Sequence, residues 1–248
     1  MNRKHAIIAA GVALTVGLIV KLPASVFLNW VLPDDVQTSG ITGTAWSGQI
    51  AAVRVRGFDA GPIEWSIKPA SLLFGALRTD INAEITGGFA SADVTLRMSS
   101  IRVRDGKIAL DLAPVTRLSS IGPTTGRAQM TINDATFEAN WPVAVDGAMV
   151  LNNLQYSGLG DATLGNYQLT FLPDLATDQF PVVAELESLD GSPYELDGTV
   201  SLGAERSYSI EAGIKPSGSA NTGYARQLAI LGPANADGVH QMSYTGSL

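Results

Sequence analysis

Apolar and polar side chains alternate along most of the chain from Gly40 onward, which is the pattern of strands that bury one face. In 62–68, for example, Ile63, Trp65 and Ile67 point to one side, and the residues between them are polar. Further segments of this kind are 77–85, 89–98, 128–132, 135–141, 143–151, 167–172, 182–186, 194–202, 208–214 and 239–246. About a dozen short strands at close spacing predict a mainly β domain, an antiparallel sheet that is either curved or sandwich-like. A few short helices are also expected, too few for parallel βαβ units.

The clearest hairpin signal is Asp105-Gly106, which lies between two alternating segments. Asp-Gly suits a type I′ turn because both of its central residues need positive φ. Such a turn would pair Val103 with Ile108 and keep both side chains on one face. The sequence therefore predicts two separate strands on either side of this dipeptide.

Glycine and proline mark the other connections. Ser47-Gly48 predicts a two-residue loop that pairs Trp46 with Gln49. The segment 69–75 predicts one short helical turn, with proline at its start and glycine at its end. Other predicted connections are a hairpin loop at 203–206 and short helices over 113–121 and from Ser219 or Asn221 to Leu231.

The run from Ala6 to Val20 is different, because it contains fifteen residues and no charge. Its strongly apolar members are Ile7, Ile8, Val12, Leu14, Val16, Leu18, Ile19 and Val20. At about −0.3 to −0.6 kcal/mol each, these side chains favour membrane insertion by roughly 2 to 5 kcal/mol. With Lys21 reaching the headgroups and Leu22 added, the run approaches the lower limit of about 17 residues for a spanning helix. Residues 1–22 are therefore predicted to form a cytoplasmic tip and one transmembrane anchor.

A cleaved signal peptide is the alternative, since an apolar region of about 7 to 15 residues after a basic start is typical of one. The best cleavage position, after Ala24, has Leu22 where a small residue is expected, which favours a retained anchor. The basic start, Arg3 and Lys4, favours a cytoplasmic amino terminus and an exported remainder. Small residues at four-residue spacing would form one stripe of the anchor, where another helix can approach: Ala9, Ala13 and Gly17.

Residues 23–39 form the segment between this anchor and the β domain, which is predicted over 40–248. Within it, 25–32 is bounded by Pro23 and Pro33, and Phe27 and Trp30 share one helical face. This pattern predicts either a short helix at the outer headgroup level, where tryptophan is favoured, or a first helix that packs on the exported core.

The charge of the chain limits its partners. The formal net charge is −7, and thirteen of the 16 basic residues but all 23 acidic residues lie beyond Lys21. The exported part therefore has a formal charge of −10, which opposes binding to nucleic acid and to anionic headgroups, so any membrane contact should be apolar. With no cysteine, disulfides and thiolate metal sites are excluded.

Catalytic and metal-binding patterns are missing from the sequence. The two histidines are His5, before the anchor, and His240, which is expected to be a surface residue. No phosphate-binding, dinucleotide-binding or calcium-loop motif is present. Carboxylates group at Asp34-Asp35 and at Glu185, Glu187 and Asp190, where solvated charge explains them as well as an acid–base pair does. The sequence predicts no enzyme, no catalytic residue, no metal and no cofactor.

Several short elements occur in a characteristic order: Leu22-Pro23-Ala24-Ser25, Gly43-Thr44-Ala45-Trp46-Ser47-Gly48, and Trp65-Ser66-Ile67-Lys68-Pro69 followed by Gly75. This succession resembles the type II secretion system protein N (GspN) family over nearly the whole chain. The resemblance marks these positions as a structural signature and carries no active site: Gly43, Thr44, Trp46, Ser47, Gly48, Trp65, Pro69 and Gly75.

The resemblance implies an accessory component of the machinery that exports folded proteins across the outer membrane. The main domain would lie in the periplasm, and its expected partners are the membrane and the secretin or the inner-membrane platform. A non-enzymatic scaffold is one expected role. The alternative is a carrier of lipid or another apolar ligand, similar to anchored proteins of the AsmA type, because one-sided alternation with few helices would leave an apolar sheet face uncovered. A periplasmic hydrolase acting through carboxylates is a third, weaker hypothesis.

Overall fold

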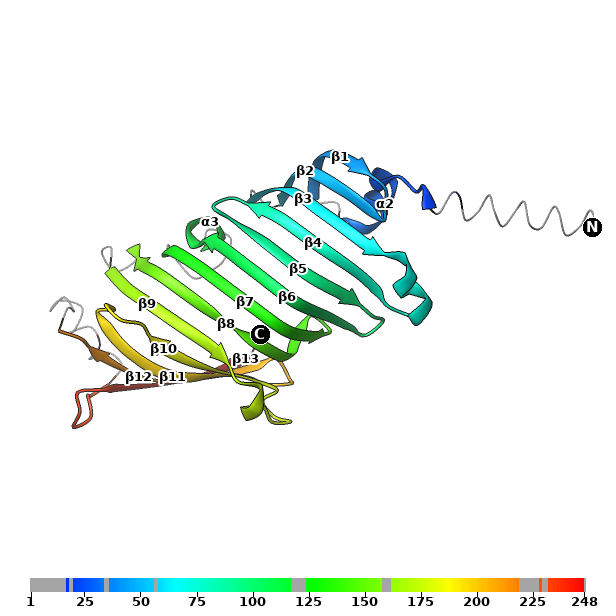
Figure 1. Cartoon of the computed structure of the whole chain (residues 1–248). Coiled ribbons are helices and arrows are strands. Elements are labelled where there is room, and N and C mark those ends of the chain that lie inside the picture. The colour runs from blue at the N-terminus through cyan, green and yellow to red at the C-terminus, as the bar shows by residue number, and fades with distance from the viewer. Residues whose placement is uncertain are drawn as a thin grey trace, which may run out of the picture.

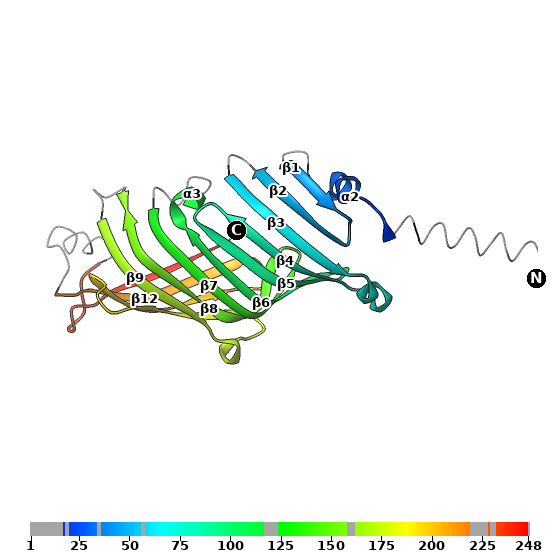
Figure 2. The same cartoon turned by 45° about the horizontal axis from the view of Figure 1, so that its top comes forward.

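The structure is a computed structural model that describes residues 17, 20–33, 36–55, 58–116, 124–157, 162–218, 228 and 232–247. Its strands form one sheet of thirteen, and each strand pairs antiparallel with its neighbours in the sequence (Figure 1). The prediction of a mainly antiparallel β fold is confirmed, and the sheet is curved and open rather than sandwich-like (Figure 2). Because the strand order follows the chain, β1 and β13 are the two edges of the sheet formed by the described strands.

The bounds of the strands are β1 (Val36–Gly43), β2 (Ser47–Val55), β3 (Phe58–Lys68), β4 (Leu77–Ile85), β5 (Gly88–Leu96), β6 (Ser100–Asp111), β7 (Thr124–Glu138), β8 (Trp141–Tyr156), β9 (Ala162–Phe171), β10 (Val182–Ser188), β11 (Tyr194–Leu202), β12 (Ser207–Pro216) and β13 (His240–Ser247). The helices are α2 (Ala24–Val31), α3 (Leu112–Thr116) and the 3-10 helices η1 (Pro69–Phe74) and η3 (Pro173–Leu175). The first strand thus starts within the segment 23–39 that separates the predicted anchor from the predicted domain. The predicted loop at 203–206 and the helical turn at 69–75 are both found.

The predicted hairpin at Asp105-Gly106 is wrong, because β6 runs through this dipeptide without turning. Asp105 does adopt a positive φ of 49°, but within a β-bulge, where it and Gly106 lie opposite the single residue Ala92 of β5. Val103 therefore pairs with β5 and β7 rather than with Ile108. The extra residue changes which face the following side chains occupy. In a regular strand, two side chains five positions apart point to opposite faces. The bulge keeps Val103 and Ile108 on the same face.

Two further predictions of register are corrected in the same way. The segments 128–132 and 135–141 belong mostly to one strand, β7, which has a bulge between Ile132 and Asp134. The loop at Ser47-Gly48 is longer than predicted: Gly43 pairs with Gly48, and Thr44 to Ser47 form the turn. In both cases the alternation located the strands, and long-range pairing decided where they bend.

Helix α2 packs on the first strands by one face only. Leu28 is 8 % exposed and contacts Ile50 and Val53 of β2, whereas Trp30 is 74 % exposed. The structure thus supports the core-packing alternative for one face of this helix. The outward Trp30 remains available for the headgroup contact that the sequence also predicts.

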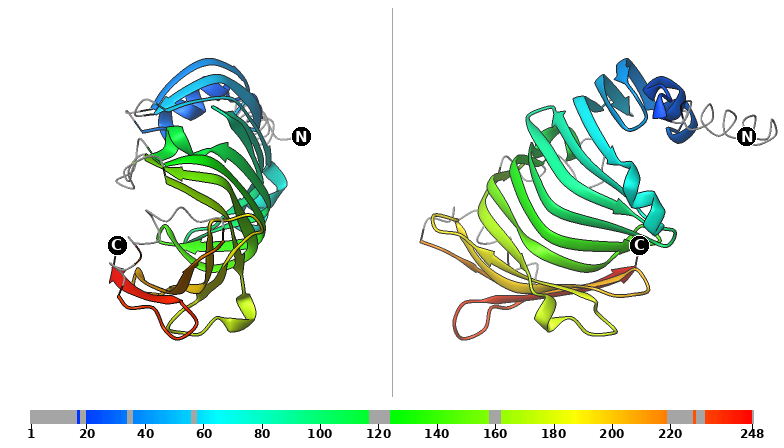
Figure 3. Two further views of the ribbon diagram at one scale, coloured as in Figure 1. Left: turned by 90° about the vertical axis from the view of Figure 1, so that its left-hand side faces the viewer. Right: turned by 45° about the vertical axis from the view of Figure 1, so that its right-hand side comes forward.

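The sheet curls so that strands distant in its order meet (Figure 3). Val182 of β10 packs with Ala135 of β7 and Val145 of β8 in a buried cluster. The indole N–H of Trp141 donates to the carbonyl of Gly203 over 2.8 Å, and Arg206 donates to the carbonyl of Ala139 over 2.7 Å. These bonds join the β7–β8 turn to the β11–β12 turn and fix the curl at one end of the strands.

Several sequence-based predictions lie outside the described residues. They include most of the anchor run, Ala9 and Ala13 of its small-residue stripe, part of 113–121, and all but Leu228 of the helix predicted up to Leu231. Of the anchor positions, only Val20 is described, together with Gly17 of the stripe. Among the described residues, no helix has the length and apolar character needed to cross a membrane.

Candidate functional site: an open apolar sheet face

One face of the sheet carries an unbroken apolar row that crosses all thirteen strands. Cross-strand partners in register lie on the same face, so the pairing defines the row. It contains one residue from each strand: Ile41, Ile50, Ile63, Ala83, Ala90, Ile108, Met130, Met149, Leu169, Leu186, Gly198, Ala212 and Met242. At about 4.8 Å between strands, this apolar row extends roughly 60 Å along the sheet. We call this side of the sheet the inner face, because the buried cluster around Ala135 closes on the same side.

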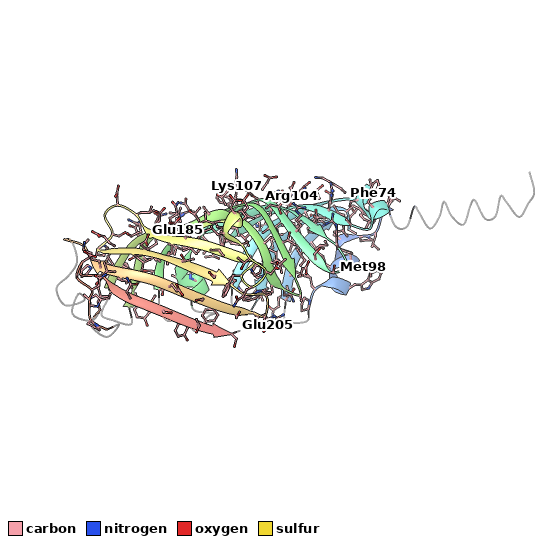
Figure 4. All side chains as sticks on the ribbon, turned by 90° about the horizontal axis from the view of Figure 1, so that it is seen from below. Phe74, Met98, Arg104, Lys107, Glu185 and Glu205 are labelled. Carbon is pink, nitrogen blue, oxygen red and sulfur yellow. The ribbon has the colours of Figure 1, made fainter. Side chains whose placement is uncertain are left out.

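The opposite, outer face is polar along the neighbouring row. Its members are Thr42, Gln49, Glu64, Asn82, Ser91, Lys107, Thr131, Ala148, Thr170, Glu185, Thr199, Glu211 and Ser243. Only Ala148 lacks a polar side chain. Arg104, Lys107 and Glu185, which lie on this face, are labelled in Figure 4. The contrast between the two rows predicts that water contacts the outer face and that the inner face binds something apolar.

Ion pairs across strands occupy the outer face. Arg102 and Arg104 of β6 both donate to the carboxylate of Asp134 on β7, with 2.9 Å from Nε of Arg102 to each oxygen and 3.1 Å from Nε of Arg104 to Oδ2. The hydrogen bonds from Arg102 are the main reason that the pKa of Asp134 lies below its usual range. Lys68 similarly donates to Asp80 over 2.9 Å and lowers the pKa of that carboxyl. These groups stay ionised and keep the outer face wetted.

The inner face carries two buried clusters, and β4 and β5, which lie between them, contribute no residue to either. Helix α2 and β1 to β3 form one buried cluster around Ile50, and β6 to β11 form the other around Ala135. Within the apolar row, only Ile50 and Ala212 are buried, and the other members are partly exposed to solvent. Contiguous exposed apolar surface on a folded domain commonly marks a binding site.

A hollow of about 130 Å³ lies in this open stretch, on β4 to β7. Small residues create it, namely Ala90, Ala92 and Gly106, and larger apolar side chains such as Ile81 and Ile108 line its walls. No described helix packs on it. Hollows of about 330 and 670 Å³ also exist, but carboxylate, amide and hydroxyl groups line much of their surfaces. The smaller, apolar hollow is therefore the candidate binding site.

The signature residues gather at one turn and its neighbours. The backbone N–H of Thr44 donates to the carbonyl of Ser47 over 2.9 Å, which closes the β1–β2 turn. The indole N–H of Trp65 donates to the carbonyl of Ala45 over 3.0 Å. A Cβ at Gly48 would lie 2.5 Å from the Trp65 ring, so only glycine fits there. The remaining members are placed nearby: Gly43 pairs with Gly48, the carbonyl of Trp46 accepts from Ile67, Pro69 starts η1 and Gly75 ends it.

The same turn receives the chain from the amino-terminal side. Pro23 forms a β-bridge with Thr44, and the backbone N–H of Ala45 donates to the carbonyl of Leu22 over 2.8 Å. The segment that follows the predicted anchor is thus fastened to the end of the sheet at which β1 finishes.

The described acidic residues and histidine that could take part in catalysis or metal binding do not gather at one site. Glu185 and Glu187 stand exposed on the outer face of β10, and Asp34-Asp35 lies outside the described residues. His240 Nδ1 lies 2.8 Å from the carbonyl oxygen of Gly232, a local contact near the start of β13. Within the described part of the chain, no group of three or more histidine and acidic side chains is placed to hold a metal ion.

Tyr167, on the inner face, forms its side-chain hydrogen bond with a nearby backbone carbonyl. The hydroxyl of Tyr167 donates to the carbonyl of Leu164 over 2.6 Å, and burial raises its pKa to about 12. Tyr167 therefore stays neutral at any physiological pH. None of the described residues that line the hollow is charged, and Ser91 is the one with a polar side chain.

Alternation in the sequence anticipated an uncovered apolar face but not its continuity. The pattern gives the face of each residue within a strand, whereas the row depends on the register between strands. Pairing each predicted strand with the next one, outward from the short turn between them, would have located most of the row. The bulge at Asp105 would still have displaced the prediction by one residue from β6 onward.

Fold and site together define a class: an open antiparallel sheet with a polar outer face and a long, partly exposed apolar inner face. The chain belongs to the family of type II secretion system protein N, whose family model matches residues 34–243. It is 25 % identical over 242 residues to the type II secretion system protein N of Vibrio cholerae serotype O1. This match covers 95 % of this chain and 94 % of that protein. The protein of the same name from Aeromonas hydrophila is 26 % identical, and the match covers 93 % of each chain. No solved structure matches the chain.

Proposed function

We propose that this chain is an accessory, non-enzymatic component of the type II secretion system, with its β domain in the periplasm. Membership of the protein N family supports the secretion role. The charge-free run 6–20 and its basic start support an anchor in the inner membrane with a cytoplasmic amino terminus. In this proposal the domain is an interaction subunit that contacts the secretin or the inner-membrane platform.

Sheet edges are the natural contact points for such a subunit, because their backbone groups lack a partner strand. Strand β13 is an edge, and Ser243 on it is exposed in the polar row. A photo-reactive residue at Ser243 should cross-link to a secretion component in native membranes. The matched control is the same residue at exposed Thr199, in the same row on the interior strand β11. Cross-linking to no secretion component from either position would contradict the proposal.

The open inner face favours a second role, which is to hold an elongated apolar ligand such as the acyl chains of a lipid. The observation that carries this proposal is the apolar row, which is partly exposed at most of its positions. Among the described residues, those that line its hollow on β4 to β7 all belong to strands. Leaving such a surface in water is unfavourable by about 25 cal/mol for each Å². A bound acyl chain would cover it without requiring any polar group from the protein.

Ala92→Trp tests the carrier role, because an indole at this position fills the hollow on β4 to β7. We expect co-purified lipid, measured by native mass spectrometry of the gently purified full chain, to fall by roughly tenfold, since losing contact with about 60 Å² of apolar surface corresponds to about 1.5 kcal/mol. Thr95→Trp is the matched control, with the same side chain on the same strand but on the outer face. Wild-type protein without bound lipid, or equal lipid in both variants, would contradict the carrier role.

A further inference from the structure

Exposed apolar side chains concentrate at one end of the strands. This end carries the turns β1–β2, β3–β4, β5–β6, β7–β8, β9–β10 and β11–β12, and we call it the anchor-side rim because Leu22 and Pro23 are fastened there. Of the eleven large apolar residues that are exposed in the described chain, six lie on it: Leu72, Leu73, Phe74, Leu96, Met98 and Leu175. Met98, Phe74 and Leu73 are the three most exposed of all, at 106, 86 and 85 %.

These side chains lie on short, well-defined supports. Helix η1 connects β3 to β4 and presents Leu73 and Phe74, and Gly75 ends it in the left-handed conformation with φ 68°. The β5–β6 turn is closed by the N–H of Arg97 donating to the carbonyl of Ser100 over 2.9 Å, which leaves Met98 at its tip. Because Leu77 pairs with Leu96, the two supports are neighbours on the rim. Figure 4 labels Phe74 and Met98 at the same end of the molecule.

The charge around these tips differs from that of the chain as a whole. Segments 68–79 and 94–101 contain the basic residues Lys68, Arg78 and Arg97 and no acidic residue, although the formal net charge of the chain is −7. Lys68 is paired with Asp80, whereas Arg78 and Arg97 have no ion-pair partner among the described residues. Apolar tips flanked by arginine are the combination that binds at the boundary between headgroups and acyl chains.

We propose that the anchor-side rim around η1 and the β5–β6 turn seats on the periplasmic leaflet of the membrane, with Leu73, Phe74 and Met98 inserted at the headgroup level. The proposal rests on the proposed function in one respect, because the predicted anchor determines which bilayer is adjacent. A lipid surface is favoured as the occupant since the chain enters the sheet at this same rim, immediately after the run 6–20. Seated this way, the strands rise from the membrane and one end of the inner face opens towards it.

The chain contains no cysteine, so single labels can be placed without background. Full-length protein with Phe74→Cys or Met98→Cys would carry an environment-sensitive fluorophore and be reconstituted in vesicles of phosphatidylcholine and phosphatidylglycerol. We expect brominated lipid to reduce the fluorescence of both labels at least about twofold, because interfacial side chains lie about 5 to 10 Å deep. The control is Phe89→Cys, whose parent side chain is 47 % exposed near the start of β5, the strand that leads to the turn with Met98. Nine residues from Met98, it lies about 30 Å along the strand and should be insensitive to the lipid.

Two variants of the labelled protein test the basic flank and the apolar tip separately. Adding Arg97→Glu should weaken quenching at position 74 more in vesicles with phosphatidylglycerol than in pure phosphatidylcholine. Leu73→Ser should weaken it equally in both. Three results would overturn the proposal: equal quenching at positions 74 and 89 by brominated lipid, equal access of both to acrylamide in water, or protection of position 74 from both quenchers. A chain that carbonate releases from the vesicles would instead contradict the anchor in the proposed function.

Discussion

Ala135→Asp is expected to unfold the β domain or to lower its midpoint of thermal unfolding by about 10 °C or more. Ala135 is 1 % exposed and packs against Ile132, Val145 and Val182, in the cluster that closes the curl of the sheet. None of these neighbours can donate a hydrogen bond from its side chain to a carboxylate. Burying such a group without a partner costs several kcal/mol, against a total stability of about 5 to 15 kcal/mol for a typical domain.

The neighbouring residue offers a matched control. Thr136 lies on the outer face, where it pairs in register with Arg102. Thr136→Asp therefore adds the same charged side chain, one residue along the same strand, beside a guanidinium in water. Circular dichroism of the full chain in detergent should show a midpoint close to that of the wild type for this variant. An unfolding midpoint for Ala135→Asp that matches the wild type would contradict the closed inner cluster.

The strand content was predictable because alternation with a period of two is a local property. Segments such as 77–85 and 194–202 carry it within nine residues, and the structure contains both as single strands. The loop at 203–206 and the helical turn before Gly75 were predictable for the same reason, since glycine and proline act on their immediate neighbours. These local signals were enough to indicate an antiparallel sheet.

The Asp105-Gly106 error shows where local reasoning ends. Aspartate accepts positive φ in a type I′ turn and also in a bulge, so the dipeptide is compatible with either. What decides between them is that β6 pairs along nearly its whole length with β5 on one side and β7 on the other. A turn at this dipeptide would break both ladders. That information lies in other strands, and the partners along β6 and β7 are up to 38 residues apart in the sequence, as Ser100 and Glu138 are.

The candidate site combines predictable and unpredictable parts. That one sheet face would be apolar followed from alternation, but the hollow depends on Ala90, Ala92 and Gly106 meeting on adjacent strands. The rim was harder still to predict, because Phe74 and Met98 are 24 residues apart in the sequence. They lie on neighbouring supports because β4 and β5 pair over their whole length. Exposure at both sites could be established only after the register was known.

Leu14→Arg is expected to release the chain from the membrane. The apolar members of the run 6–20 favour insertion by roughly 2 to 5 kcal/mol, and an arginine near the middle costs about 2.5 to 3.5 kcal/mol in addition to the lost leucine. The net free energy of insertion then falls close to zero. Most of the protein should move from the carbonate-resistant pellet to the extractable fraction when membranes are washed at high pH.

The control for this experiment also introduces an arginine, but places it before the run, where basic residues already occur. Asn2→Arg adds a third basic residue before the run, next to Arg3 and Lys4, and should leave the chain in the pellet because cytoplasmic positive charge favours the predicted orientation. Intact mass measurement of the wild-type protein completes the test. A mature chain that starts after Ala24 would identify a cleaved signal peptide, and a Leu14→Arg chain that resists carbonate would show that the domain is held by other contacts. If the mature wild-type chain retains the run and the Leu14→Arg variant is released, the fifteen residues 6–20 account for the attachment to the membrane. The rim then only orients the sheet on the bilayer.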